Sequence, residues 1–173
     1  MKTIETVYSN HAEKPYIAPE YEQELLEKPI AKWAMERTEE GLLPGHIIML
    51  WRVHFGTYTT DYPHHKYFAT TYGIDAQKEL EFLIKQGYVK IDSAFDSLRH
   101  LPAGKLKQWL KEKEVVGLSK MKRADLDQAM IIAYEEDELA KQFDLRGYSL
   151  SDKGDKTLAK YPEIIAKHPQ KKY

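Results

Sequence analysis

The sequence predicts a mainly α-helical fold, with a helical N-terminal region, a helix-turn-helix pair and a small C-terminal strand–helix element. Apolar residues recur three and four positions apart in segments bounded by proline and glycine, which is typical of amphipathic helices. Runs with strand character are short. With 173 residues, of which 42% are hydrophobic, the chain is long enough to bury a core as one domain or two small ones.

Residues 1–19 are expected to form a polar N-terminal arm, because Pro15 and Pro19 interrupt any periodicity. The opening MKTIETVYSN lacks the apolar segment of a signal peptide, and the most apolar run, Ile47 to Trp51, is too short to cross a bilayer. Cysteine is absent, which excludes disulfides and thiolate metal sites. These features predict a cytoplasmic protein with no membrane partner.

Residues 20–95 are expected to form a helical region. Two helices are predicted, from Pro29 to Gly41 and from Pro44 to Gly56, because proline suits the first turn of a helix and glycine ends it. A short helix is expected from Pro63 to Gly73, and Asp75 is placed to cap a helix that ends at Gly87. The apolar faces of the first two helices are marked by Ile30, Trp33, Ala34 and Arg37, and by Ile47, Ile48, Leu50, Trp51 and Phe55.

Residues 97–142 are expected to form a helical pair around the stretch LPAGKLKQWLKEKEVVGLSKMKRADL, residues 101–126. The first helix is predicted from about Pro102 to Lys113 and the second from about Lys120 to Gln142, with Gly117 in the turn between them. We expect four leucines of this pair to pack together: Leu106, Leu110, Leu118 and Leu126.

Two short strands are predicted, Tyr88–Ile91 and Tyr148–Leu150. The second belongs to residues 143–173, a C-terminal element that is expected to pack on the rest of the chain. Within this element, Ser151 is placed to cap a last helix.

Charge is distributed unevenly along the chain, although its net charge is only −1. Residues 97–130 contain 8 Lys and Arg against 4 Asp and Glu, whereas residues 1–40 contain 5 against 9. A basic segment within a nearly neutral protein favours a polyanionic partner.

The basic segment also resembles a known family. Its sequence supplies Leu106-Lys107, Leu110-Lys111, Gly117-Leu118-Ser119, Lys122-Arg123-Ala124 and Leu126. This pattern resembles the SAP domain, a helix-turn-helix-like module of DNA-associated proteins, and the wider layout is similar to SAP-containing proteins of Gram-positive bacteria and their phages. The chain departs from the pattern in a longer first helix and in Lys120-Met121, which replaces Ser-Gly in a loop one residue shorter. The family brings that loop close to DNA.

The start of the second helix would attract an anion on physical grounds alone. The first N–H groups of a helix lack internal partners and carry the positive end of its dipole. Cations beside that end are unfavourable unless an external anion compensates them. Together with the resemblance, this predicts non-enzymatic binding of nucleic acid, in the first place double-stranded DNA, through phosphate contacts. The predicted binding residues are Lys107, Lys111, Gly117, Ser119, Lys120, Lys122 and Arg123.

Two alternatives stay open at this point. A protein-interaction or adaptor module of the phage type would use the acidic N-terminal arm or the aromatic loop that holds Tyr58, Tyr62 and Tyr67. A metal-dependent hydrolase would need ligands from histidines and a carboxylate in one region, but their spacing matches no known metal motif. No serine-nucleophile or phosphate-binding glycine motif occurs, so we expect no enzymatic activity, no metal and no cofactor. The possible ligands are His46, His54, Asp61, His64 and His65.

Overall fold

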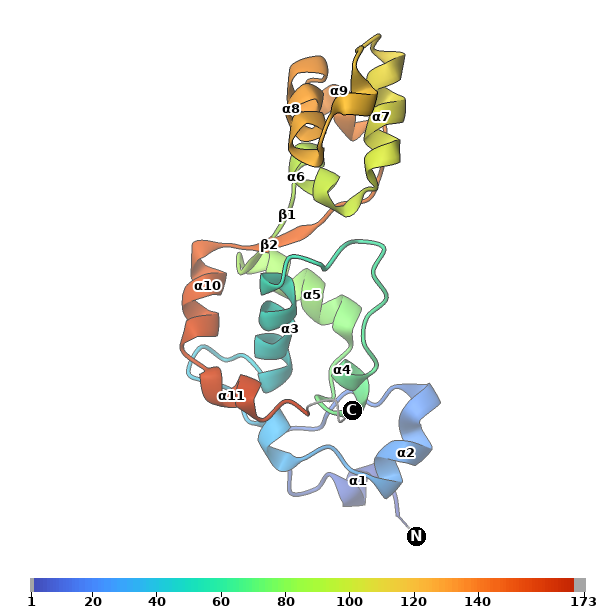
Figure 1. Cartoon of the computed structure of the whole chain (residues 1–173). Helices are drawn as coiled ribbons and strands as arrows, with labels where there is room; N and C mark the ends of the chain where they lie inside the picture. The colour runs from blue at the N-terminus through green and yellow to red at the C-terminus, as the bar shows by residue number, and fades with distance from the viewer. Residues whose placement is uncertain (1, 170–173) are drawn as a thin grey trace. The chain divides into compact units, whose positions relative to one another are not determined.

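The structure is a computed structural model of the chain and describes residues 2–169 (Figure 1). It is mainly helical with one two-stranded antiparallel sheet, so the predicted fold class is confirmed. The chain divides into two compact units. Unit 1 comprises the residues up to Phe55, residues 63–90 and the residues from Leu150 onward, and unit 2 comprises residues 56–62 and 91–149. Within residues 2–169, none of the helices combines the length and apolar character needed to cross a membrane.

Unit 1 is organised around α3 (Pro44–His54), whose residues are buried on nearly every side. Three helices pack on it: α5 (Ala76–Lys85), α10 (Asp152–Ala159) and α11 (Pro162–Ala166) (Figure 1). The predicted caps are confirmed, because Asp75 accepts a hydrogen bond from the Lys78 N–H at 3.4 Å and Ser151 accepts one from the Gly154 N–H at 3.1 Å. Local sequence signals therefore identify the starts of α5 and α10 correctly.

The N-terminal segment of unit 1 forms α1 (Ile4–Val7), the 3₁₀ turn η1 (Pro19–Tyr21) and α2 (Glu22–Glu27). Tyr8 lies between these elements with 4% of its surface exposed. Its hydroxyl donates to the Leu25 carbonyl at 2.9 Å and accepts from the Ile30 N–H at 3.1 Å. We expected residues 1–19 to form a polar arm. In the structure, Tyr8 instead packs within unit 1.

The helix predicted from Pro29 to Gly41 is wrong, since only a 3₁₀ turn, η2 (Lys32–Met35), forms there. The backbone of Glu36 is extended, with φ −96° and ψ 115°, and this ends the 3₁₀ turn. Arg37 then leaves the predicted face, and its guanidinium binds Glu13 at 2.7 and 2.8 Å and the Gly41 carbonyl at 2.7 Å. Tertiary hydrogen bonds outweigh the local helical pattern here.

The helix expected from Pro63 to Gly73 is also shorter in the structure, where α4 covers Tyr67–Thr70. The strands β1 (Val89–Ile91) and β2 (Tyr148–Leu150) form the sheet. After contributing residues 56–62 to unit 2, the chain enters that unit a second time within β1 and returns to unit 1 within β2. Both predicted strands are confirmed, the second with the expected bounds.

Unit 2 is built from α6 (Ala94–Ser97), the turn η3 (Leu98–His100), α7 (Ala103–Glu112), the turn η4 (Leu118–Lys120), α8 (Arg123–Ala133) and α9 (Glu136–Ala140). The predicted leucine cluster is confirmed. Three of the leucines are at most 1% exposed, and Leu118 packs against them half-buried. The buried core residues are Ala94, Leu98, Leu106, Trp109, Leu110, Leu126, Met130, Tyr134 and Leu139.

The second helix of the pair was predicted to continue to Gln142, but α8 ends at Ala133. Tyr134 is extended, with φ −124° and ψ 146°, and lies buried in the core. Its hydroxyl donates to the Trp109 carbonyl at 3.2 Å. The separate helix α9 then begins with Glu136, whose carboxylate accepts from the Ala94 N–H at 2.9 Å. Burial of one aromatic ring and capping of a neighbouring helix explain the break.

Candidate nucleic-acid interface

The two helices of the predicted pair run in the same direction. At the start of α8, the Arg123 guanidinium donates to the carbonyls of Leu101 at 2.7 Å and Leu98 at 2.5 Å, which precede α7. At the other end, Tyr134 after α8 reaches the carbonyl of Trp109 in the last turn of α7. Figure 1 shows α7 and α8 side by side in unit 2. Both helix N-termini therefore lie at the same end of the pair.

A ten-residue connection, residues 113–122, returns the chain along the pair. Glu114 and Gly117 adopt positive φ angles of 61° and 79° within it. Only glycine takes this conformation at little cost, so Gly117 has a geometric role in the turn. After it, η4 packs against α7 and carries Ser119 and Lys120, both exposed.

Parallel helices add their dipoles, which places two positive ends at the start of the pair. Lys122 is the N-cap residue of α8, and its own N–H donates to Asp125 at 3.0 Å. The Asp125 carboxylate thus accepts a hydrogen bond from the N-cap N–H of α8. The next N–H groups of the first turn have no partner within the helix, as at any helix N-terminus.

The predicted lysines fall into two pairs. Lys107 and Lys111 are four residues apart on α7, the first half-buried and the second exposed, while Lys120 and Lys122 flank Met121 before α8 and are exposed. Like charges at this helical spacing destabilise a helix by a few tenths of a kcal/mol. In the part of the chain that the structure describes, none of these four lysines has a carboxylate within ion-pair distance.

Two neighbouring cations differ from these lysines because carboxylates of unit 2 hold them. Lys113 forms an ion pair with Glu138, and this hydrogen bond lowers the pKa of the Glu138 carboxyl below its usual range. Arg123 bonds Asp127 at 3.1 Å besides the two carbonyls before α7. We predicted Arg123 as a phosphate ligand, and the structure places its guanidinium in contacts that join α8 to η3.

Two of the histidines expected as possible metal ligands are hydrogen-bonded to side chains of α5, while His65 lies next to His64 in the lining of one pocket. His46 is 2% exposed, and its Nδ1 accepts from the Leu43 N–H at 2.9 Å, so the proton is on Nε2, which donates to Glu79 at 2.7 Å. This bond lowers the pKa of Glu79. His64 is hydrogen-bonded to Gln77 at 2.8 Å. Among residues 2–169, no group of three potential ligands is arranged to hold a metal ion.

The aromatic loop is divided between the units: Tyr58 and Tyr62 belong to unit 2, whereas Tyr67 begins α4 of unit 1, and Tyr62 and Tyr67 are half-buried. Tyr58 is fully buried, and its ring lies 5.9 Å from that of Tyr148 and 5.7 Å from that of Tyr62. Its backbone carbonyl also accepts from the Tyr148 N–H at 3.2 Å. The ring of Tyr58 therefore contributes to packing, as expected for a core residue.

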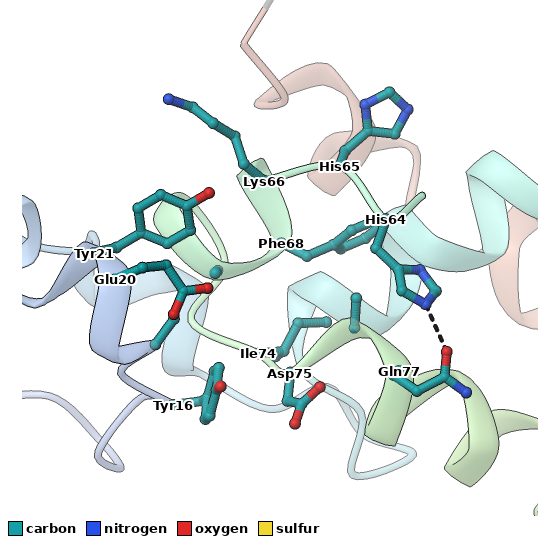
Figure 2. Close-up of a pocket in the computed structure, with 13 residues that line it drawn as sticks. Tyr16, Glu20, Tyr21, His64, His65, Lys66, Phe68, Ile74, Asp75 and Gln77 are labelled. Atoms are coloured by element: carbon teal, nitrogen blue, oxygen red, sulfur yellow. Dashed lines mark hydrogen bonds between the residues drawn. The ribbon is translucent and has the colours of Figure 1, made fainter. Parts of the chain in front are cut away.

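A pocket in unit 1 was not predicted from the sequence. Figure 2 shows it between the N-terminal segment and the start of α5, with Tyr16, Glu20 and Asp75 at its edge. The residues from Tyr16 to Tyr21 were assigned to an arm or its border, so their contribution was missed. The apolar pair Ile17-Ala18 between two prolines was the available signal, since Ala18 is only 2% exposed.

Comparison of the chain with models of protein families, with curated proteins and with solved structures finds no match.

Proposed function

We propose that unit 2 binds double-stranded DNA without catalysing a reaction, through phosphate contacts from Lys107, Lys111, Lys120 and Lys122. The observation that supports this proposal is the contrast between these lysines and the paired cations beside them. Lys113 and Arg123 are held by carboxylates, whereas the four lysines have none in the described structure. A phosphate backbone would compensate the charges that the fold leaves uncompensated.

The aromatic rings of unit 2 favour a duplex over a single strand, because Tyr58, Trp109, Tyr134 and Tyr148 are buried and Tyr62, Phe95 and Phe143 are half-buried. Proteins that bind single strands stack bases on exposed aromatic side chains. Trp109 and Tyr134 are each 3% exposed and Tyr58 is fully buried, so their faces are not accessible to bases. Phosphate contacts position a protein on a duplex but do not read its sequence, so we expect weak sequence preference.

The dependence of affinity on salt tests the proposal. Four phosphate contacts give a slope of log affinity against log salt of about −3.6, with affinity on the order of micromolar at physiological salt. The variant Lys120→Ala/Lys122→Ala should flatten this slope by about two units. A matched control is Lys32→Ala/Lys78→Ala, which removes two exposed lysines of unit 1 and should leave the slope unchanged.

The titration uses a labelled duplex at several salt concentrations, with circular dichroism to confirm that each variant is folded. No binding by the unaltered protein at low salt would refute the proposal. Equal slopes for the unaltered protein and the Lys120/Lys122 variant would show that these cations make no phosphate contacts, and an adaptor function would then take first place.

A further inference from the structure

Unit 1 contains a pocket of about 220 Å³ that plays no part in the proposed DNA binding. Three backbone segments surround it: residues 16–21, residues 64–69 at the start of α4, and residues 74–77 at the start of α5 (Figure 2). All three segments belong to the same compact unit. The pocket is therefore defined within one body of the protein.

The N-terminal wall of the pocket is held by backbone contacts. The Tyr16 N–H donates to the Gly73 carbonyl at 2.7 Å. Gly73 has a φ of 62°, and a Cβ at this position would lie 2.5 Å from the Cβ of Pro15. Such a close approach is possible only at glycine. The segment that carries Tyr16 is thus fixed against the turn between α4 and α5.

The pocket combines an apolar interior with aromatic edges. Its interior is formed by buried residues, namely Ala18, Phe68, Ile74 and Ala76. Tyr16 is 42% exposed and Tyr21 is half-buried, so both rings are accessible at the rim. An alkyl chain could contact the interior while its polar end meets the rim.

Two carboxylates lie at this rim. Asp75 accepts only a long hydrogen bond, 3.4 Å, from the Lys78 N–H, and within residues 2–169 no ion pair or hydrogen bond engages the Glu20 carboxylate. Lys66 is the lysine of the lining, and Figure 2 shows its side chain extending away from Asp75 and Tyr16. Its ammonium lies 6.0 Å from the centre of the Tyr21 ring. The Tyr21 ring therefore already has a cation near it in this structure.

We propose that this pocket binds an alkylammonium group, such as the side chain of a lysine. The carboxylates of Glu20 and Asp75 would attract the ammonium, and the exposed Tyr16 ring would add cation–π attraction. The apolar interior would take the methylene chain. The volume equals that of about seven water molecules, which suits a chain of this size.

Nuclear magnetic resonance titration of the ¹⁵N-labelled full chain tests this proposal without DNA. The probes are Nα-acetyl-lysine methylamide, its uncharged analogue Nα-acetyl-norleucine methylamide, and 1,4-diaminobutane. We expect the two amines to give saturable shifts of the Tyr16, Glu20 and Asp75 amides, with millimolar dissociation constants. Preference for the lysine derivative indicates a lysine of a partner protein as the ligand, and preference for the diamine indicates a free polyamine.

Substitutions separate a specific pocket from general attraction to a charged surface. Asp75→Asn keeps an N-cap residue for α5 but removes the charge, and Glu20→Gln removes the second charge. We expect the double variant to bind the amines about tenfold more weakly. The control Glu36→Gln/Glu163→Gln makes the same change in net charge at exposed positions outside the pocket and should bind normally.

Three results would overturn the proposal. The first is equal binding of the norleucine and lysine derivatives, the second is normal amine binding by the Asp75/Glu20 variant, and the third is the absence of saturable shifts near the pocket. None of these results depends on the lysines of unit 2, so the test leaves the DNA proposal untouched.

Discussion

Arg123 should stabilise unit 2 without contributing to DNA affinity, and the substitution Arg123→Met separates the two roles. Methionine keeps much of the apolar stem but removes every donor. The carbonyls of Leu98 and Leu101 would lose their charged partner, and the contact between the start of α8 and η3 would weaken. The ion pair with Asp127 would also be lost. Both of its side chains are at least 36% exposed, so this loss should cost little stability.

The magnitude follows from these contacts. Hydrogen bonds from a charged donor contribute about 1.5–3 kcal/mol each when buried, whereas exposed ion pairs contribute about 0–1 kcal/mol. Because the Arg123 side chain is 36% exposed, water can replace part of each bond. We therefore expect the variant to lower the unfolding free energy of unit 2 by about 2 kcal/mol.

Hydrogen exchange measured by mass spectrometry reports this change for each unit separately. A loss of about 2 kcal/mol makes the amides of α7 and α8 that exchange through unfolding of unit 2 exchange roughly 30-fold faster. Amides of α3 in unit 1 serve as the internal reference. The adjacent substitution Lys122→Met is the matched control. It also removes one cation, but the Lys122 side chain makes no hydrogen bond or ion pair within residues 2–169, so exchange should change little.

Two results would contradict this reasoning. Unchanged exchange of α7 in Arg123→Met would show that the bonds to the two carbonyls contribute nothing to stability. A flattening of the DNA salt slope by about one unit, in a variant that remains folded, would show that Arg123 also contacts phosphate.

Two further predictions concern unit 1. Gly154→Ala should lower the unfolding free energy by about 2 kcal/mol or more in urea titration, because its Cβ would lie 2.2 Å from the Tyr88 carbonyl oxygen. The control is Gly104→Ala in α7 of unit 2, which has open space around it and should be neutral or slightly stabilising. Hydrogen bonds from Lys160 and Tyr161 lower the pKa of Glu40 to about 2, so its contribution to stability should be full above pH 4.5 and disappear as the pH falls towards 2. Urea titration from pH 7 to pH 3 compares the unfolding free energy of the unaltered protein with that of Glu40→Gln. The difference between the two should shrink as the pH falls. A constant difference would show that Glu40 does not have a lowered pKa.

The sequence was sufficient to predict helices whose ends carry local signals. Pro44 begins α3, Asp75 caps α5 and Ser151 caps α10, as their residue types indicated. Capping and proline placement act within one turn of the chain, so a single sequence contains the necessary information. The leucine cluster of unit 2 was predictable for a similar reason, since its members recur at helical spacing on either side of Gly117.

The remaining features depend on residues that are distant in the sequence. The segment from Pro29 to Gly41 has a helical pattern, but the contact between Arg37 and Glu13, 24 positions apart, accompanies an extended backbone. The parallel direction of α7 and α8 likewise depends on Arg123 reaching back to Leu98. The pocket of unit 1 combines three separate segments. Periodicity describes one face of one element and does not identify the partner of that face.

The same limit applies to the charges that suggested a nucleic-acid partner. Residues 97–130 contain 8 lysines and arginines, and counting them alone would predict a salt slope of about −7. The structure reduces this number, because Arg99 pairs with Asp92 at 2.8 Å, Lys113 pairs with Glu138, and Arg123 pairs with Asp127. The ammonium of Lys105 lies 5.5 Å from the centre of the Trp109 ring. Cations with internal partners would have to give them up to bind phosphate. The four lysines that have no carboxylate partner within residues 2–169 predict a slope of about −3.6, so the measured slope discriminates between the two counts.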